Sequence, residues 1–239
     1  MQQLTFVCCV NRPEVARRCV LTSPCLAPER GHQLVLASGM GSAAEGFAWG
    51  ARLARHEWMV MLHQDVYLPE GWDVVFAASL AAAVAKWPML AVAGVYGVRA
   101  DGVHAGHVFD RDRWLGELPV PAQAVRSLDE LLLAVRLDTG LAPDCGLGWH
   151  LYGTDLCLRA QSEGWGAAVI EAPCEHRASL LRDVGAATAA QREALAPVVA
   201  AFNASARRLA ELWPQAMPVV TPVAALDTGF ELTLPQPAP

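Results

Sequence analysis

The sequence predicts an α/β fold in which a mostly parallel sheet is flanked by helices. Three observations favour this fold. Short runs alternate with helical segments over residues 4–63, and those runs are mostly apolar without the strict alternation of a half-exposed strand, as expected of strands buried on both faces. The 239 residues are 54% hydrophobic, which is enough to form the core of one large domain.

The first part of the chain follows the order β-α-β-α-β. Strands are expected at 4–10, 32–38 and 57–63, and helices at 11–23 and 42–57. Asn11 can cap the first helix, and Pro13 suits its first turn. Ser42 and Glu45 have capping-box spacing at the start of the second helix. This alternation indicates parallel strands joined by right-handed crossovers.

The later elements are less regular. We expect a helix at 74–86, a strand at 89–97, a hairpin or irregular excursion at 98–126, helices at 127–136 and 154–164, a strand at 167–173 and an amphipathic helix at 188–213. Ser127 and Glu130 have capping-box spacing, and Thr154 can cap the helix that Gly164 ends. The predicted divisions are a domain over 1–182, a C-terminal helical extension over 183–230 and a disordered tail over 231–239.

Charge and cysteine content exclude several classes of protein. The net charge of -6 and the absence of a basic run argue against nucleic acid as a partner. The apolar runs are too short to span a bilayer, so no transmembrane segment is expected. Seven cysteines without a C-x-x-C pair predict neither a disulfide framework nor a zinc module. Together these features favour a cytoplasmic protein.

Charged residues follow two predicted strands at the same edge of the sheet. His63, Gln64 and Asp65 end the strand at 57–63, and His176 follows the strand at 167–173. Ligands in such sheets bind beyond the carboxyl ends of the strands. One carboxylate and one imidazole suit Mn²⁺ better than Mg²⁺. Each residue alone could equally be a solvated loop residue.

Further candidates lie around the predicted helix at 154–164. Asp155 occupies its first turn, where the helix dipole favours an anion, and could act as a general base. It could equally be only an i,i+4 partner of Arg159. An aromatic wall for a sugar could come from residues just before the helix, namely Trp149, His150 and Tyr152. Asp129 and Trp114 are the remaining candidate contacts for a sugar or acceptor, Trp114 lying in the excursion at 98–126.

Three segments in this order resemble one enzyme family. They are "LHQDVYLPEGW" at 62–72, "SLDELLL" at 127–133 and "HLYGTDLCLRAQSEGW" at 150–165. With the βαβαβ start, they resemble the family 2-like glycosyltransferases of the Rossmann-like GT-A fold, in particular a bacterial subgroup linked to capsule and antibiotic sugars. The resemblance covers about residues 4–180.

This resemblance implies a function and a set of roles. A sugar would move from a nucleotide-diphosphate sugar to a carbohydrate or other acceptor hydroxyl, with inversion, in polysaccharide biosynthesis. Asp65 and His176 would bind a divalent cation, with Mn²⁺ preferred, and Asp155 would be the catalytic base. The expected nucleotide contacts are Val10, Asn11, Glu14 and Gln64.

The sequence departs from this family at three positions. His63 replaces the first acid of the D-x-D motif, Ala48 stands where an asparagine is frequent, and Thr154 replaces a second acid. These departures leave open a catalytically degenerate relative that only binds a nucleotide. Two further alternatives are a nucleotidyltransferase, although "NRPEVARRC" is not the Gly- and Lys-rich loop of such enzymes, and a metal-dependent hydrolase that uses His63, Asp65 and His176, although such enzymes normally have more His and Asp ligands.

Overall fold

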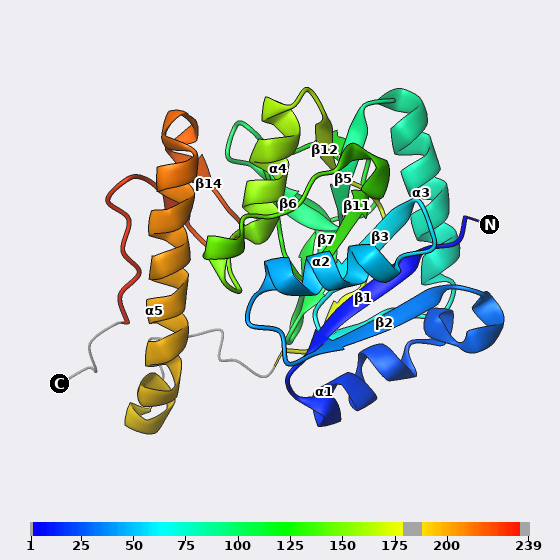
Figure 1. Cartoon of the computed structure of the whole chain (residues 1–239), viewed down its shortest axis with the longest axis horizontal. Coiled ribbons are helices and arrows are strands. Elements are labelled where there is room, and N and C mark those ends of the chain that lie inside the picture. The colour runs from blue at the N-terminus through cyan, green and yellow to red at the C-terminus, as the bar shows by residue number, and fades with distance from the viewer. Residues whose placement is uncertain (1, 179–187, 235–239) are drawn as a thin grey trace.

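The computed structural model of the protein describes residues 2–178 and 188–234 (Figure 1). Its helices are α1 (Pro13–Arg18), α2 (Ala43–Leu53), α3 (Trp72–Lys86), α4 (Tyr152–Ser162) and α5 (Ala189–Leu212). Its strands are β1 (Thr5–Val10), β2 (Gln33–Ser38), β3 (Trp58–Leu62), β4 (Val66–Tyr67), β5 (Leu90–Gly94), β6 (Tyr96–Val98), β7 (His104–Asp110), β8 (Arg113–Gly116), β9 (Gln123–Ala124), β10 (Ser127–Leu128), β11 (Leu132–Arg136), β12 (Gly166–Val169), β13 (Glu175–His176), β14 (Val219–Val220) and β15 (Ala225–Leu226).

The main sheet is mostly parallel, as the sequence predicts. Its strand order is β2-β1-β3-β11-β5-β12-β9. The strands β2, β1 and β3 are parallel neighbours, and β5 and β12 form another parallel pair. Only β11 and β9 run against their neighbours. The carboxyl ends of β1, β2 and β3 therefore meet at one edge, which is where the candidate site lies.

Helices cover both faces of this sheet, which explains why its central strands β3 and β5 are apolar and buried at every position. Alternate side chains of a strand point to opposite faces. Val7 and Met61 pack in the core cluster on the face covered by α2 and α4. Phe6 and Val60 pack in a second cluster with Phe76 of α3 on the other face.

A second sheet carries the predicted excursion. Its order is β10-β6-β7-β13-β4, and β8 pairs with β7 to form a hairpin within residues 98–126. The strand β13 runs parallel to the end of β7 and antiparallel to β4. This pairing brings His176 opposite both Asp110 and Val66, which lies next to the end of β3.

The predicted helix at 127–136 is wrong. Residues 132–136 form β11 in the centre of the main sheet, paired with β3 and β5. The physical reason is burial: Leu131 to Val135 are all at most 2% exposed, so the segment has no polar face to present to solvent. Ser127 and Glu130 form no capping box either, because the Ser127 hydroxyl bonds to Thr154 and the Glu130 carboxylate accepts from the Gly153 N–H.

Two helix starts also differ from their predictions. The first helix spans only Pro13–Arg18, and its N-cap position is Arg12 instead of Asn11. The helix α4 begins before Thr154, with Leu151 at the N-cap in a left-handed conformation (φ 64°). Gly153 permits this close start, because a Cβ atom there would lie 2.6 Å from the carbonyl oxygen of Leu128. The predicted N-cap at Ser42 is confirmed, because its side chain accepts from the Glu45 N–H. The predicted stop at Gly164 is also confirmed, because this residue follows α4 in a left-handed conformation with φ +82°.

The C-terminal helix α5 matches the amphipathic helix predicted at 188–213 and stands along one side of the molecule (Figure 1). Its Phe202 and Leu209 share a core cluster with Leu156 of α4. The predicted boundary near 183 and most of the tail predicted as disordered lie outside the described residues, although Leu232 is described and exchanges two hydrogen bonds with Asn203. No helix in the described part of the chain is both long and apolar enough to cross a membrane.

Candidate functional site

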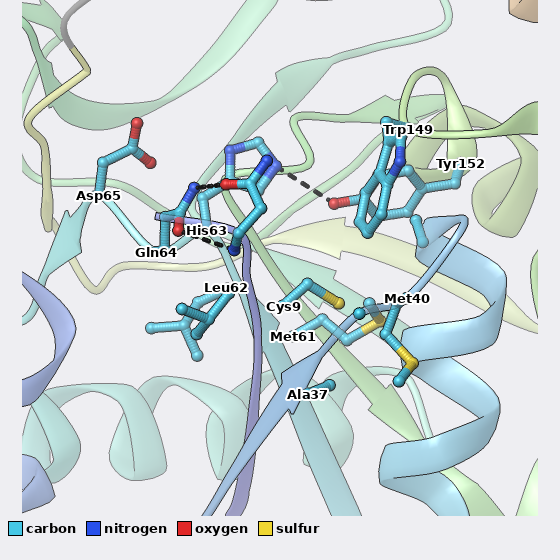
Figure 2. Close-up of a pocket in the computed structure, with 14 residues that line it drawn as sticks. Cys9, Ala37, Met40, Met61, Leu62, His63, Gln64, Asp65, Trp149 and Tyr152 are labelled. Atoms are coloured by element: carbon cyan, nitrogen blue, oxygen red, sulfur yellow. Dashed lines mark hydrogen bonds between the residues drawn. The ribbon is translucent and has the colours of Figure 1, made fainter. Parts of the chain in front are cut away.

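A pocket of about 290 Å³ opens at the carboxyl ends of β1, β2 and β3 (Figure 2). Its floor comes from the ends of these strands and includes Cys9, Ala37 and Met61. One wall carries Trp149 and Tyr152, and the opposite rim carries the segment from His63 to Asp65. The predicted site edge is therefore hollow and combines apolar walls with a polar rim.

His63, Asp65 and His176 form a cluster at the rim of this pocket. Each offers one ligand atom, and the three atoms lie within 4.8 Å of one another. His176 Nε2 is 3.4 Å from Asp65 Oδ1, and the rings of His63 and His176 are 5.7 Å apart between centroids. The predicted proximity of Asp65 and His176 is confirmed, and His63 joins them.

The cluster holds positive charge on His176. Burial alone would lower the pKa of His176, but hydrogen bonds from its ring to Asp110 and Asp65 outweigh burial and raise that pKa to about 10. For Asp65, burial would raise the pKa, but the hydrogen bond and charge of His176 lower it below its usual value. The pKa of His63 is lowered by burial and by the charge of His176, so this imidazole is neutral. A single positive charge thus sits between carboxylates.

Each histidine has a partner outside the cluster on one of its ring nitrogens. The Nδ1 atom of His176 lies 2.9 Å from Asp110 Oδ1, at the end of β7. The Nε2 atom of His63 lies 3.2 Å from the Tyr152 hydroxyl, which also donates to the Glu130 carbonyl. Such partners fix the orientation of a histidine and are typical of metal-binding imidazoles.

The predicted nucleotide contacts lie partly at the pocket. Val10, Asn11 and Gln64 line it, whereas Glu14 is exposed and pairs with Arg12. The amide of Gln64 donates to Asn11 Oδ1 at 2.5 Å and accepts from the Asn11 and Arg12 backbone N–H groups. Gln64 therefore ties the loop after β1 to the end of β3.

The predicted sugar and acceptor contacts divide into two groups. Tyr152 lines the pocket, whereas Asp129 is half-buried outside the pocket lining and accepts from the Leu131 N–H; its charge favours the charged forms of both histidines. His150 instead packs edge-on against Phe202 of α5. Trp114 lies on the β7–β8 hairpin, 50% exposed, and stacks on His107 at 4.5 Å between ring centroids.

Asp155 does not line the pocket. Its carboxylate is fully buried and accepts hydrogen bonds from Trp213 Nε1 at 2.7 Å and from the Asp144 N–H at 2.8 Å. Arg159 lies 3.3 Å away, so the i,i+4 pairing considered from the sequence is confirmed. This position gives the predicted role of general base no support, because no Asp155 oxygen is open to a ligand.

The C-terminal helix supports one wall of the pocket indirectly. Ser205 of α5 donates to the Leu147 carbonyl, and the neighbouring Gly148 carbonyl accepts from the Ala43 N–H at the start of α2. Ala43 and Trp149 line the pocket. The wall is therefore connected to α5 through the segment 145–149.

Sequence reasoning missed two members of the site. The glycosyltransferase prediction left His63 out of the cation ligands, although the hydrolase alternative included it, and its i,i+2 spacing from Asp65 at a strand end is a signal for two side chains on one side. Asp110 falls in a segment without a clear period, and only the pairing of β7 with β13 brings it to His176.

Comparison with solved structures supports the fold. The chain resembles a crystal structure of GalNAc-T7 with UDP, GalNAc and Mn2+, with 12% identity and a TM-score of 0.51, over 74% of this chain and 44% of that chain. The chain thus spans less than half of that protein. A mannosyltransferase PcManGT from Pyrobaculum calidifontis, in complex with GDP-Man and Mn2+, aligns over 76% of this chain and 58% of its own with 13% identity and a TM-score of 0.44. The fold is of the GT-A type.

Comparison by sequence gives the family. No protein-family model matches the chain. A protein of Fuscovulum blasticum named "ATP synthase subunits region ORF 6" is 32% identical over 169 residues, which cover 65% of this chain and 67% of that protein. The name states no activity. At this identity and coverage, the chain belongs to the family of the Fuscovulum blasticum ORF 6 protein.

Proposed function

We propose that this protein is a glycosyltransferase that moves a sugar from a nucleotide-diphosphate sugar to an acceptor hydroxyl. The observation that carries the proposal is the cluster of His63, Asp65 and His176 at the rim of the pocket. The GT-A type of fold is consistent with it, and the solved structure with the higher TM-score contains UDP, GalNAc and Mn2+.

The cluster fits a divalent cation. Its donor set is one carboxylate and two imidazoles, and each imidazole has a partner outside the cluster on one ring nitrogen. Despite burial, the carboxylates of Asp110 and Asp65 raise the pKa of His176 and favour positive charge there, and a bound cation would displace the His176 proton. Imidazole ligands favour Mn²⁺ over Mg²⁺. A cation bound there would neutralise the negative charge of a donor diphosphate.

The pocket residues would bind and orient the donor. Its apolar floor and Trp149 suit the flat face of a nucleobase. Val10, Asn11 and Gln64 would contact the nucleoside, and the Gln64–Asn11 hydrogen bonds would keep that wall rigid. Tyr152 would hold His63 in place while it faces the diphosphate.

The chemical step would be a single displacement. The acceptor oxygen attacks the anomeric carbon, the bond to the diphosphate breaks, and the configuration inverts. Asp129, rather than the buried Asp155, is the carboxylate that would take the acceptor proton, because it lies near both histidines of the cluster. Trp114 on the exposed hairpin would offer an aromatic face to an acceptor sugar, whereas His150 packs away from the pocket.

Thermal-shift measurements test the donor site first. UDP, GDP and their sugar conjugates would be added with and without Mn²⁺ to wild type, Asp65→Ala and the exposed control Asp138→Ala. A nucleotide at about 100 times its Kd stabilises by about 2.7 kcal/mol. We expect an Mn²⁺-dependent shift in wild type and Asp138→Ala that Asp65→Ala loses.

A transfer assay then tests the reaction. Release of nucleoside diphosphate from the donor that binds would be followed in wild type and Asp129→Asn. Asp129→Asn should bind nucleotide normally and lose turnover. Nucleotide binding without any sugar release in wild type would instead indicate a degenerate relative, and no binding of any nucleotide would refute the proposal.

A further inference from the structure

A second pocket of about 390 Å³ lies beside the first and is rich in arginine. We call it the arginine pocket; its polar lining consists of Arg12, Arg18, Arg177, Gln64 and Asp65. Gln64 and Asp65 also line the first pocket. The two pockets therefore meet at the end of β3, with the Asp65 carboxylate between them.

The arginines come from separate parts of the chain and two of them are tied to the site. Arg12 precedes α1, and its backbone N–H donates to Gln64 Oε1 at 2.9 Å. Arg177 follows β13, and its backbone N–H donates to the Asp65 carbonyl at 2.8 Å. Arg18 stands at the end of α1. These bonds fix where two of the guanidinium stems leave the backbone.

The charge of this pocket is unusual for the chain. Three arginines and one aspartate line it, although the whole protein has a net charge of -6. Arg12 pairs with Glu14 at 3.1 Å. Arg177 also pairs with Glu175 and lies 3.8 Å from the centroid of the Tyr67 ring. Both Arg177 and Glu175 are about one third exposed, at 38% and 31%, so this ion pair contributes little to stability and does not explain the arrangement.

Guanidinium groups recognise phosphate well. Each carries five N–H donors in a planar fork, and charge-assisted bonds to phosphate are among the strongest hydrogen bonds in proteins. A nucleobase or an uncharged carbohydrate carries no negative charge that three arginines would neutralise. The size and the lining of the arginine pocket match a group with two or more anionic oxygens.

We propose that the arginine pocket binds a phosphate group of a ligand, separately from the cation site. The phosphate belongs either to the diphosphate of the donor or to an acceptor that is itself phosphorylated. This assignment of the source rests on the proposed function, but the binding of phosphate does not. In either case the nucleoside lies in the first pocket and the phosphate lies in the arginine pocket, with Asp65 between them.

The test is calorimetric titration of inorganic pyrophosphate at fixed ionic strength, with a chelator present so that no divalent cation contributes. Three proteins are compared. They are wild type, a double variant that carries both Arg18→Gln and Arg177→Gln, and the control Arg17→Gln. Arg17 neighbours Arg18 on α1 and is likewise exposed, but it does not line the pocket. The double variant should bind pyrophosphate at least about tenfold more weakly, and the control should match wild type.

Several outcomes overturn the proposal. They are no binding of pyrophosphate by wild type, equal binding by the double variant, and an equal loss in Arg17→Gln, which would indicate only overall charge. Circular dichroism checks folding. If the double variant does not fold, Arg18→Gln alone answers the question, because this exposed side chain lies at a helix end.

A second titration identifies the source of the phosphate. The Mn²⁺-dependent affinity for UDP and GDP is measured in wild type and the double variant. A weaker affinity in the variant assigns the arginine pocket to the donor diphosphate, whereas an unchanged affinity assigns it to a phosphorylated acceptor. Failure of nucleotides to bind would refute the proposed function and leave the pyrophosphate result standing.

Discussion

Replacing Asp155 with alanine separates a structural role from a catalytic one. The buried carboxylate accepts from the Trp213 indole and from the Asp144 N–H, and it pairs with Arg159. Alanine leaves these donors without an acceptor in the interior. Each buried donor without a partner costs about 1–3 kcal/mol.

The expected loss of stability for Asp155→Ala is about 3–5 kcal/mol. Two half-buried donors, the Trp213 indole and the Asp144 N–H, account for most of it, and the total matches the cost of breaking a buried ion pair. The loss of stability is expected in the lower half of this range, because the Arg159 side chain is 27% exposed and water can solvate it in part. In a chain of this size such a loss lowers Tm by roughly 6–20 °C.

Urea unfolding followed by circular dichroism measures this change, with Asp138→Ala as a surface control expected to stay within about 0.5 kcal/mol of wild type. Asp155→Asn, which keeps one acceptor oxygen, should lose less than Asp155→Ala. The reasoning fails if Asp155→Ala is as stable as wild type but binds nucleotide without turnover. That result would restore the role of general base predicted from the sequence.

Three further predictions follow from packing and charge. Desolvation raises the pKa of Glu130 to about 8, so folding favours its neutral form and stability falls as pH rises from about 4.5 to 8. The free energy of unfolding of Glu130→Gln should exceed that of wild type by roughly 2–4 kcal/mol at pH 9, measured by urea titration. Equal pH profiles of the two proteins would contradict this. Burial would raise the pKa of Asp73, but hydrogen bonds from Arg30 and His32 lower it below 3.8. This carboxylate therefore stabilises the fold above that pH, and the stabilisation is lost as pH falls. Asp73→Asn should flatten the acid side of a plot of Tm against pH, and an unchanged slope would refute this stabilising role. A Cβ atom at Gly50 would lie 2.4 Å from Val7 Cγ2, so Gly50→Ala should destabilise by about 1–3 kcal/mol despite its better helix propensity, whereas a gain in stability would show that the strand yields.

The sequence predicted the sheet well where strand and helix signals differed clearly. The apolar runs at 4–10 and 57–63 became β1 and β3, and the hairpin came from 98–126 as expected. It failed at 127–136, because a short apolar run fits a buried strand and a buried helix equally, and only its partners β3 and β5 decide.

The site was predictable in part for the same reason. Asp65 and His176 follow parallel strands, so topology alone places them at one edge, and the cluster confirms it. The position of Asp155 could not be predicted, because its partner Trp213 follows α5 and lies 58 residues away in the sequence, a contact that no local pattern encodes.

The link from α5 to the pocket wall has a consequence for how the protein can be altered. None of the residues that line either pocket lies in α5. A chain shortened after residue 178 would therefore keep every lining residue and still lose the hydrogen bond from Ser205 to Leu147 and the packing around Leu209. Substitutions or deletions in α5 should therefore weaken ligand binding although no residue of the helix lines either pocket. A fusion partner is better attached at the N-terminus than in place of the C-terminal residues.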